Sequence, residues 1–323
     1  MACVDVSTVS RALNNTAYVH PETKKKVMEA VKQLSYQPNL LAKGLRQGKR
    51  HSIGIVVPSI ALTLFGEISQ RIEMEARKRN YGVMICHTKD EPEQEAACLN
   101  RLRNGLVDGI VIASTGQNTR LIRDIKASGL PVIQMIRAQD KTISGVTANF
   151  RQCAYEGVRY LLEKGAKQIG FINGDMEVSP FLERYKGYSK ALQEARLPEY
   201  VSKAQSPRQA GFVDGYRGAN YLLDVNPGLD CIITAVDMQG LGVLRALKER
   251  GCRVPQDVRV MSLSGHSIGS MLETTMTSME IPAKPMGLAI TQMMIEDIER
   301  QAGTEQPLRF EIFNAALMIR ETT

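Results

Sequence analysis

Nine lysine and arginine residues stand within the first 51 positions of this 323-residue chain, against three acids, so that segment has a net charge of +6. The remaining 272 residues hold 32 bases and 31 acids and carry only +1. Cationic side chains gathered in this way neutralise phosphates, which favours contact with nucleic acid or another anionic surface. A basic end that is merely solvated is the alternative. The nine bases are Arg11, Lys24, Lys25, Lys26, Lys32, Lys43, Arg46, Lys49 and Arg50.

Other kinds of chemistry find little support in the sequence. The six cysteines stand singly without a CxxC pair, which argues against a zinc site or a disulfide framework and favours a reducing, cytoplasmic setting. We find no nucleophile elbow, Walker loop, GxGxxG after a strand or metal-ligand cluster, so we expect no enzyme, no metal site and no cofactor. The longest uncharged apolar stretch, Ser52–Gly66, falls short of the roughly twenty residues of a spanning helix. We therefore expect neither a membrane span nor a signal peptide.

Helical patterns fill the basic segment. Asp5 and Ser7 stand in N-cap positions before a short helix over Thr8–Leu13, which Asn14–Asn15 closes. A second helix begins at Pro21–Glu22 and ends before residue 36, and the segment that follows, residues 39–46, is too short to remain helical alone. The second helix has an apolar stripe at helical spacing, which we expect to be buried: Val27, Ala30, Val31 and Leu34.

From Ser52 onward, β-branched runs alternate with amphipathic helices, a pattern that predicts parallel sheets covered on both faces, in two doubly wound halves. Such sheets bind ligands beyond the carboxyl ends of their strands, so we expect a ligand in a cleft between the halves. The predicted strands are Ile53–Val57, Gly82–Cys86, Gly109–Ala113, Val132–Ile136, Gln168–Asn173, Cys231–Ala235 and Val258–Leu263. The predicted helices lie near residues 65–79, 92–103, 119–128, 153–164, 180–195, 208–224, 238–249 and 286–300.

Several strings in one order resemble the lac repressor family of bacterial transcription regulators. In the basic segment these are Val6–Asn14, Val19–Thr23 and Tyr36–Asn39, followed by Ser52–Pro58. Further along they are Arg184–Tyr188, Asp237–Gly242, Val254–Val258 and Ala316–Glu321, so the resemblance covers essentially the whole chain. It implies an α/β core of two doubly wound parallel-sheet subdomains like a periplasmic binding protein, with a small all-α helix-turn-helix headpiece. It also implies a hinge helix, a homodimer and a small effector that alters affinity for operator DNA.

The resemblance assigns DNA contacts to the basic segment. Val6, Ser7 and Arg11 match base-contacting positions, and the Arg11 guanidinium suits a bidentate contact with guanine. Leu45 matches a residue inserted into the minor groove, and its alternative role is packing beneath the core. For the serines and threonines of this segment, capping a helix is the alternative to holding DNA. Hydroxyl and amide side chains implied to hold DNA are Thr8, Ser10, Asn14, Thr23 and Asn39.

The beginning of the chain departs from the family pattern. The family has about ten residues before the alanine that Ala2 matches, and they form the first headpiece helix. We therefore expect a truncated headpiece whose first helix is missing. Either the start of the chain was lost through a gene-model choice, or this headpiece folds poorly. Cys3 also replaces the usual glycine of the turn, and Asp5 replaces a neutral residue.

The resemblance places an effector in the cleft. Leu62, Leu64 and Phe65 match the loop after the first core strand, and Arg184 matches an arginine that binds effector oxygens. Asp237 starts a helix, so we expect it to act mainly as an N-cap and secondarily as a ligand contact. Ser264 and His266 are further candidates, although a lone loop histidine is commonly just solvated.

Other cleft positions favour an anionic effector. Ala148, Val236 and Ser264 stand where acids or an amide are common, and the loss of those groups leaves Arg184 less neutralised. The stretches Ser262–His266 and Met271–Thr274 are similar to the sucrose- and trehalose-operon repressor branches, which implies a disaccharide or its phosphate.

The sequence therefore predicts a cytoplasmic, DNA-binding repressor of a carbohydrate operon with a sugar or sugar-phosphate effector. A sugar-binding protein of the periplasmic type without DNA regulation is the alternative. We expect a partial headpiece over residues 1–36, a hinge helix and linker over 37–51 and a core over 52–323. The core would divide into an N-subdomain of about 52–150 and 282–310 and a C-subdomain of about 151–281 and 311–323.

Overall fold

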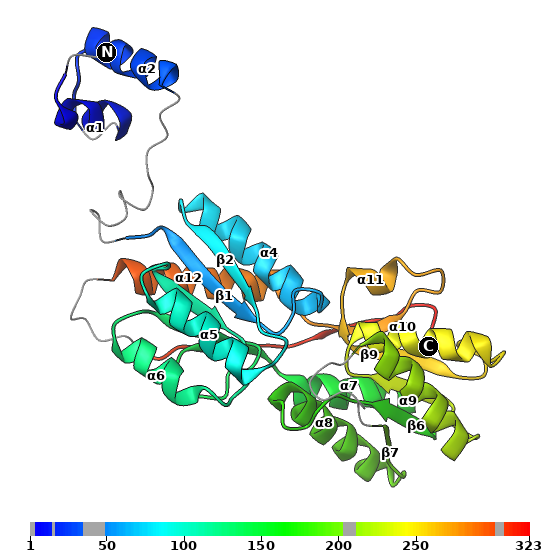
Figure 1. Ribbon diagram of the computed structural model, residues 1–323. Coiled ribbons are helices and arrows are strands. Elements are labelled where there is room, and N and C mark those ends of the chain that lie inside the picture. The colour runs from blue at the N-terminus through cyan, green and yellow to red at the C-terminus, as the bar shows by residue number, and fades with distance from the viewer. Residues whose placement is uncertain (1–3, 15–16, 35–48, 203–210, 301–306) are drawn as a thin grey trace. The chain divides into compact units, whose positions relative to one another are not determined.

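The structure is a computed structural model that describes residues 4–14, 17–34, 49–202, 211–300 and 307–323. The chain divides into two compact units, residues 1–50 and residues 51–323, and each is described by itself (Figure 1). The candidate hinge residues Asn39 and Leu45 lie outside the described residues.

The first unit contains two helices, α1 (Val6–Asn14) and α2 (Pro21–Gln33). They pack through Ala12 and Val27, which are both buried. The stripe predicted on α2 is only partly buried, because Leu34 is 60 % exposed. Within that stripe, Val27 is the buried residue, and the short helix α1 packs against α2.

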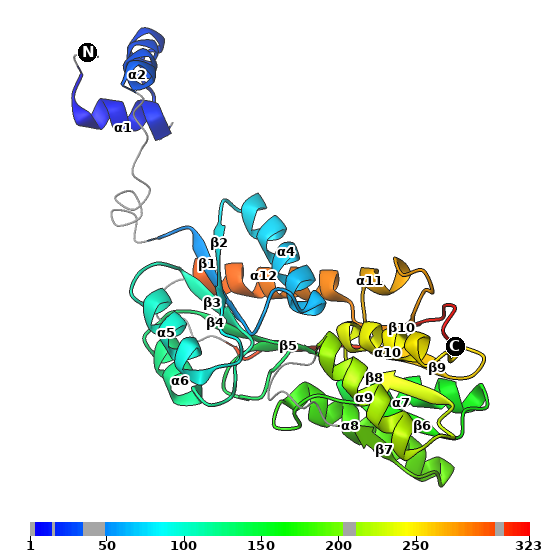
Figure 2. The ribbon, with the colours of Figure 1, turned by 45° about the vertical axis from the view of Figure 1, so that its right-hand side comes forward.

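The second unit holds two six-stranded sheets (Figures 1 and 2). The first sheet has the strand order β11-β5-β4-β3-β1-β2, and every pair in it is parallel. Its strands are β1 (Ser52–Val57), β2 (Gly82–His87), β3 (Gly109–Ile112), β4 (Val132–Met135), β5 (Gly145–Ala148) and β11 (Phe310–Phe313). Helices α4 (Thr63–Lys78) and α12 (Ala283–Glu299) cover one face, and α5 (Pro92–Arg103) and α6 (Thr119–Ala127) cover the other.

The second sheet repeats the arrangement with the order β12-β10-β9-β8-β6-β7, and it is parallel except that β12 runs antiparallel to β10. Its strands are β6 (Ile169–Ile172), β7 (Tyr200–Ser202), β8 (Cys231–Thr234), β9 (Arg259–Gly265), β10 (Thr277–Glu280) and β12 (Ala316–Met318). Helices α7 (Phe150–Glu163) and α8 (Ser179–Ala195) pack on one face, and α9 (Phe212–Val225) and α10 (Asp237–Glu249) pack on the other. The short helix α11 (Ser267–Ser270) follows β9.

Three crossings join the two sheets, which we call the first and second subdomains. The chain crosses between Ala148 and Phe150, between Glu280 and Ala283, and between Phe313 and Ala316. The last crossing lies a few residues beyond the predicted division near residue 310, because β11 pairs with β5 of the first sheet.

Glycines allow the backbones of paired helices in the second subdomain to come into direct contact. A Cβ on Gly187 of α8 would lie 2.1 Å from the carbonyl oxygen of Arg151 on α7. Cβ atoms on Gly215 of α9 and Gly242 of α10 would lie 2.0 and 2.1 Å from carbonyl oxygens of the opposite helix. No side chain fits these positions without moving a backbone, so each helix pair is locked at close range.

All seven predicted strands are present, and each predicted helix within the described residues overlaps an observed one. The predicted hinge helix lies outside the described residues. The sequence did not predict the strands β5, β7, β10, β11 and β12, all three or four residues long. Polar residues interrupt β5, β10 and β11, and β7 and β12 are only three residues long, so periodicity does not separate these strands from loops.

Candidate functional site

The N-terminus of α1 is organised by Asp5. Its carboxylate accepts hydrogen bonds from the backbone N–H groups of Ser7 and Thr8 at 2.6 and 3.2 Å and from the Thr8 hydroxyl at 3.1 Å. These bonds, led by those from Ser7, lower the pKa of Asp5 to about 2. Asp5 is therefore the cap, as predicted, whereas the predicted second cap, Ser7, lies inside the first turn because the helix already begins at Val6.

The candidate DNA-binding side chains of the described residues lie mainly on α1. Val6 is 85 % exposed, and Ser7 and Arg11 are also exposed, which leaves them accessible to a partner. Thr8 and Ser10 are half-buried, as is Thr23 in the first turn of α2. Asn14 is the last residue of α1. The structure thus gathers Val6, Ser7 and Arg11 on one short helix.

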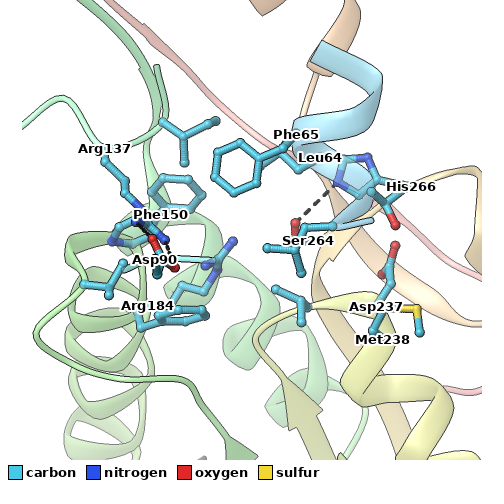
Figure 3. A pocket seen from close by; sticks show the side chains of 17 residues that line it. Leu64, Phe65, Asp90, Arg137, Phe150, Arg184, Asp237, Met238, Ser264 and His266 are labelled. Atoms are coloured by element: carbon cyan, nitrogen blue, oxygen red, sulfur yellow. Dashed lines mark hydrogen bonds and ion pairs between the residues drawn. The ribbon is translucent and has the colours of Figure 1, made fainter. Parts of the chain in front are cut away.

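A cavity lies in the second unit at the carboxyl ends of the strands of both sheets (Figure 3). All seven candidate effector residues line it, namely Leu62, Leu64, Phe65, Arg184, Asp237, Ser264 and His266. This position is the one that topology dictates for a ligand site in open α/β sheets. Most of the remaining lining is apolar and comes from Ile136, Phe150, Val178, Pro180, Phe181, Val236 and Met238, and the polar remainder is Thr63, Asp90 and Arg137.

Arg184, on the second turn of α8, is the most unusual group in the cavity. The residue is 2 % exposed, and its buried Nε has no hydrogen-bond partner among the described residues. The guanidinium carbon lies 4.4 Å from the ring centre of Phe150 and 5.8 Å from that of Phe181, in cation–π contact. Burial lowers the pKa of Arg184 to about 10, only partly opposed by Cys153 and Asp237. The cation is retained at neutral pH without a carboxylate bound to it.

Asp237 is the first residue of α10, and Val236 occupies the N-cap position. The expected capping role is wrong, because neither carboxylate oxygen makes a hydrogen bond of normal geometry to the helix. Both oxygens are buried, and burial raises the pKa of Asp237 to about 6, although the Ser262 hydroxyl and His266 act in the opposite direction. Asp237 is a second poorly compensated group facing the cavity.

His266 is buried rather than solvated. Its Nε2 lies 3.4 Å from the Ser264 hydroxyl oxygen, and its Nδ1 lies 3.1 Å from Oε2 of Glu67. Glu67 belongs to α4 of the first subdomain, so this contact spans the cavity's two sides. Hydrogen bonding from His266 lowers the pKa of Glu67, which keeps that carboxyl ionised.

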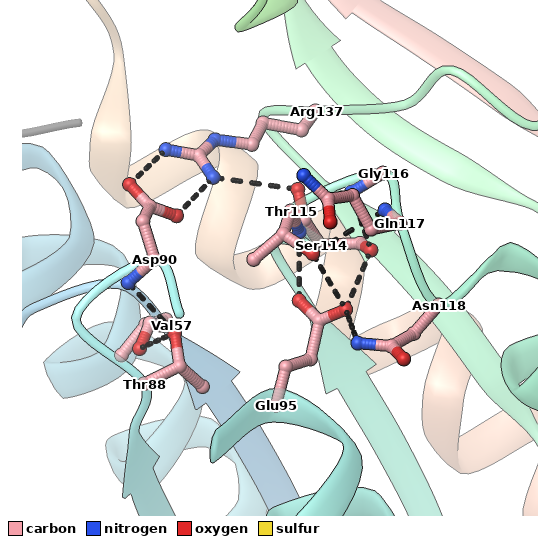
Figure 4. Close-up of polar contacts among 10 residues, drawn as sticks. All are labelled: Val57, Thr88, Asp90, Glu95, Ser114, Thr115, Gly116, Gln117, Asn118 and Arg137. Carbon is pink, nitrogen blue, oxygen red and sulfur yellow. Dashed lines mark hydrogen bonds and ion pairs between the residues drawn. The ribbon is translucent and has the colours of Figure 1, made fainter. Parts of the chain in front are cut away.

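Sequence reasoning missed a buried ion pair on the first-subdomain side. Arg137 donates to both oxygens of Asp90, at 2.5 and 2.9 Å, and Nη1 also approaches the Ser114 carbonyl oxygen at 3.3 Å (Figure 4). Asp90 follows β2 and Arg137 follows β4, and their position after strands was the available signal. The pairing itself joins residues 47 apart and has no local pattern.

Glu95 fixes the loop against which Arg137 lies. This fully buried carboxylate on α5 accepts from the Ser114 hydroxyl, the Thr115 backbone and hydroxyl, and the Asn118 amide, at 2.7 to 3.1 Å (Figure 4). The loop therefore presents the Ser114 carbonyl to Arg137 from a fixed place. Arg137 is therefore hydrogen-bonded both to the Asp90 carboxylate and to a carbonyl oxygen that Glu95 holds in place.

Metal and membrane features are absent from the part of the chain that the structure describes. No cluster of three or more His, Cys, Asp or Glu side chains there suits a metal ion. No helix among the described residues is long and apolar enough to cross a membrane.

Comparison with known proteins decides the family. Residues 50–320 match the model for periplasmic binding proteins and the sugar binding domain of the LacI family, and residues 1–39 match the model for bacterial regulatory proteins of the lacI family. The chain belongs to the lacI family of bacterial regulatory proteins. It is 32 % identical to the HTH-type transcriptional regulator RegA of Clostridium acetobutylicum, over 93 % of this chain and 90 % of that one.

Other relatives of this lacI-family regulator cover nearly its whole length. It is 29 % identical to the ribose operon repressor of Halalkalibacterium halodurans, over 100 % of this chain and 94 % of the repressor. Its fold is similar to that of the lac repressor dimer bound to operator and the anti-inducer ONPF, with a TM-score of 0.86, 21 % identity and 99 % and 96 % coverage. It is also similar to the regulator CelR in its complex with cellobiose, with a TM-score of 0.76, 24 % identity and 100 % and 97 % coverage.

Proposed function

We propose that this lacI-family regulator represses a carbohydrate-utilisation operon and that a sugar or sugar phosphate in the cavity sets its affinity for operator DNA. The observation that carries the proposal is Arg184, a buried cation that lines the cavity and whose Nε has no hydrogen-bond partner among the described residues. Burying a charged group without hydrogen-bond partners costs free energy, and a ligand that supplies those partners removes the cost. A negatively charged or hydroxyl-rich ligand would supply the missing acceptors.

The DNA-binding half of the proposal rests on the first unit. Its match to the lacI-family model, its net positive charge and the exposed Val6, Ser7 and Arg11 on α1 support a headpiece that contacts bases and phosphates. A sugar-binding protein without DNA regulation does not account for these features. The ribose operon repressor and the operator-bound lac repressor dimer among its relatives support a homodimer on operator DNA.

The cavity's composition supports a carbohydrate-type ligand. Phe65, Phe150 and Phe181 offer apolar ring faces, while Arg184, Asp237 and Ser264 offer polar groups that orient hydroxyls. Arg184 without a bound carboxylate favours an anionic form such as a phosphate ester. The CelR–cellobiose complex supports a disaccharide-sized ligand in this fold.

Regulation follows from the two subdomains. An effector that binds one arrangement of the subdomains more tightly shifts the population toward it, by no more than its differential affinity for the two arrangements. The residues between the two units then transmit that shift to the headpieces of a dimer. Because its partner is operator DNA, we place the regulator in the cytoplasm.

We further propose that the chain has no catalytic activity. Ser264, His266 and Glu67 follow the order hydroxyl, imidazole, carboxylate, but the 3.4 Å between Ser264 and His266 exceeds the roughly 2.6–3.2 Å of an activated nucleophile. Incubation with p-nitrophenyl acetate tests this point, and release of nitrophenol above the background of a Ser264→Ala variant would contradict it.

Isothermal titration calorimetry of the full chain tests the effector proposal. Sucrose and trehalose are compared with sucrose 6-phosphate and trehalose 6-phosphate. We expect a phosphorylated sugar to bind roughly tenfold or more tightly than its parent, since a hydrogen bond to a charged group contributes roughly 1.5–3 kcal/mol. Arg184→Ala is expected to remove most of that preference.

Two outcomes oppose the proposal. A preference for the neutral sugar, or a phosphate preference that survives Arg184→Ala, would overturn the anionic effector. DNA binding is measured separately, by selection from a random duplex library, with Arg11→Ala as the variant. If the parent chain enriches no near-palindromic site, the DNA-binding half of the proposal fails for this polypeptide.

A further inference from the structure

The contact between Glu67 and His266 joins the two subdomains beside the cavity. Glu67 lies on α4 of the first subdomain, and its carboxylate meets His266 Nδ1 at 3.1 Å and the Ser267 hydroxyl at 3.3 Å. His266 and Ser267 belong to the end of β9 and the start of α11 in the second subdomain. Both hydrogen bonds therefore exist only while the subdomains hold this arrangement.

The protons in this contact follow from its geometry. A glutamate carboxyl is ionised at neutral pH and acts only as an acceptor, and Glu67 meets both His266 Nδ1 and the Ser267 hydroxyl. Nδ1 must then carry the hydrogen that the contact needs. A neutral imidazole has one ring proton, so Nε2 is left with its lone pair.

The lone pair of Nε2 faces the polar side of the cavity. Nε2 is the nitrogen turned toward the Ser264 hydroxyl, 3.4 Å away, and His266 and Ser264 both line the cavity (Figure 3). The charged groups around the ring are Glu67 on α4 and Asp237 on α10, and Glu280 on β10 acts on Asp237 in turn. This corner therefore presents acceptors and one hydroxyl to a ligand.

We propose that Glu67 is a positioning residue that makes His266 a hydrogen-bond acceptor toward the effector, and that it does so only in the arrangement of the two subdomains that brings Glu67 and His266 together. The effector group that meets His266 is then a donor, a hydroxyl or an ammonium. This second statement rests on the proposed function of the cavity as the effector site. Effector recognition and the arrangement of the two subdomains are coupled, because both depend on the hydrogen bond between Glu67 and His266.

Nitrogen NMR of the full chain labelled with ¹⁵N-histidine tests the positioning role without any effector. The chain has four histidines, and the His266 signals are identified by their loss in His266→Asn. We expect the neutral His266 ring of the parent chain to carry its proton on Nδ1. In Glu67→Ala the proton is expected to move to Nε2.

Two further variants keep the test decisive. Glu67→Asp retains the negative charge but is one methylene shorter, so it too is expected to lose the Nδ1–H form. Glu73→Ala removes a half-exposed acid from the same helix, and the tautomer is expected to stay. A parent chain with its proton on Nε2, or a tautomer that survives in Glu67→Ala and Glu67→Asp, would overturn the positioning role.

Calorimetry with sucrose 6-phosphate and trehalose 6-phosphate then tests recognition. For a probe that binds the parent chain, Glu67→Ala is expected to weaken binding roughly tenfold, and Glu73→Ala to leave it unchanged. Unchanged affinity beside a changed tautomer would overturn the recognition statement. If neither probe binds, the anionic effector fails while the NMR result still decides the positioning role.

Discussion

The buried charged groups on the two sides of the cavity differ in how far neighbouring groups neutralise them. On the first-subdomain side, Asp90 and Arg137 neutralise each other through two hydrogen bonds. On the second-subdomain side, Arg184 has an unpartnered Nε and Asp237 has no hydrogen bond of normal geometry. The first side is complete without a ligand, whereas the second retains polar groups that a ligand can satisfy.

This difference separates charges that belong to the fold from charges that belong to the site. A matched buried pair is strongly destabilising to break but gives a ligand little to bind. A buried charge without a partner reduces stability in the free protein and becomes favourable only in a complex. Substitutions on the two sides should therefore change stability in opposite directions.

The largest expected effect is on the first-subdomain side. Arg137→Ala leaves Asp90 buried without its guanidinium partner, and we expect the core to lose about 3–5 kcal/mol of unfolding free energy. Arg184→Met, which replaces a buried cation by an apolar side chain of similar length, is expected to be neutral or stabilising by about 1–4 kcal/mol. Urea unfolding followed by circular dichroism measures both, because the chain has no tryptophan.

Arg123→Ala is the matched control for this pair of variants. Its ion pair with Asp140 is at the surface, where such pairs contribute about 0–1 kcal/mol. Equal losses in Arg137→Ala and Arg184→Met would erase the distinction between the two sides.

A smaller effect concerns pH and Asp237. Burial raises its pKa from 3.8 to about 6 in the folded chain, so the folded state holds a proton that the unfolded state releases earlier. The stability linked to this group is fully present below about pH 4 and is lost as pH rises to about 6, by roughly 3 kcal/mol.

Asp237→Asn should remove that loss. We expect the variant to be more stable than the parent above pH 6 and to lack the parent's decline between pH 4 and 6, as measured by urea unfolding across this range. A parent and a variant whose stabilities change in parallel with pH would show that Asp237 is better compensated than its surroundings indicate.

The smallest effect is expected at Ser264. Its hydroxyl is neutral and lies beside His266, so Ser264→Ala should weaken the binding of a sugar phosphate only about twofold to tenfold. Stability should change by less than about 1 kcal/mol. Calorimetry and thermal melting provide the two values, and a loss as large as that of Arg184→Ala would make Ser264 a main ligand contact.

The sequence predicted the frame of the molecule well because its main strands are continuous apolar runs between amphipathic helices. The resemblance to the lac repressor family also identified seven residues that line one cavity, which lies where an open α/β sheet binds ligands. The antiparallel strand β12 escaped prediction because it is three residues long.

Electrostatic partners could not be predicted in the same way. Arg137 meets Asp90 across 47 residues and Glu67 meets His266 across 199, and no local spacing encodes such pairs. Asp237 was expected to cap α10, yet the helix begins one residue earlier than a cap at that position requires. Burial decides the chemistry of these groups, and burial emerges only when distant strands are assembled.

The glycines between helices α7 and α8 and between α9 and α10 have a mechanical consequence. Backbones in direct contact at Gly187, Gly215 and Gly242 leave no side-chain layer to deform, so each pair can move only as one solid piece. A displacement that a ligand imposes on the backbone of α8 through Arg184 is therefore expected to carry α7 with it, so that the two helices shift together.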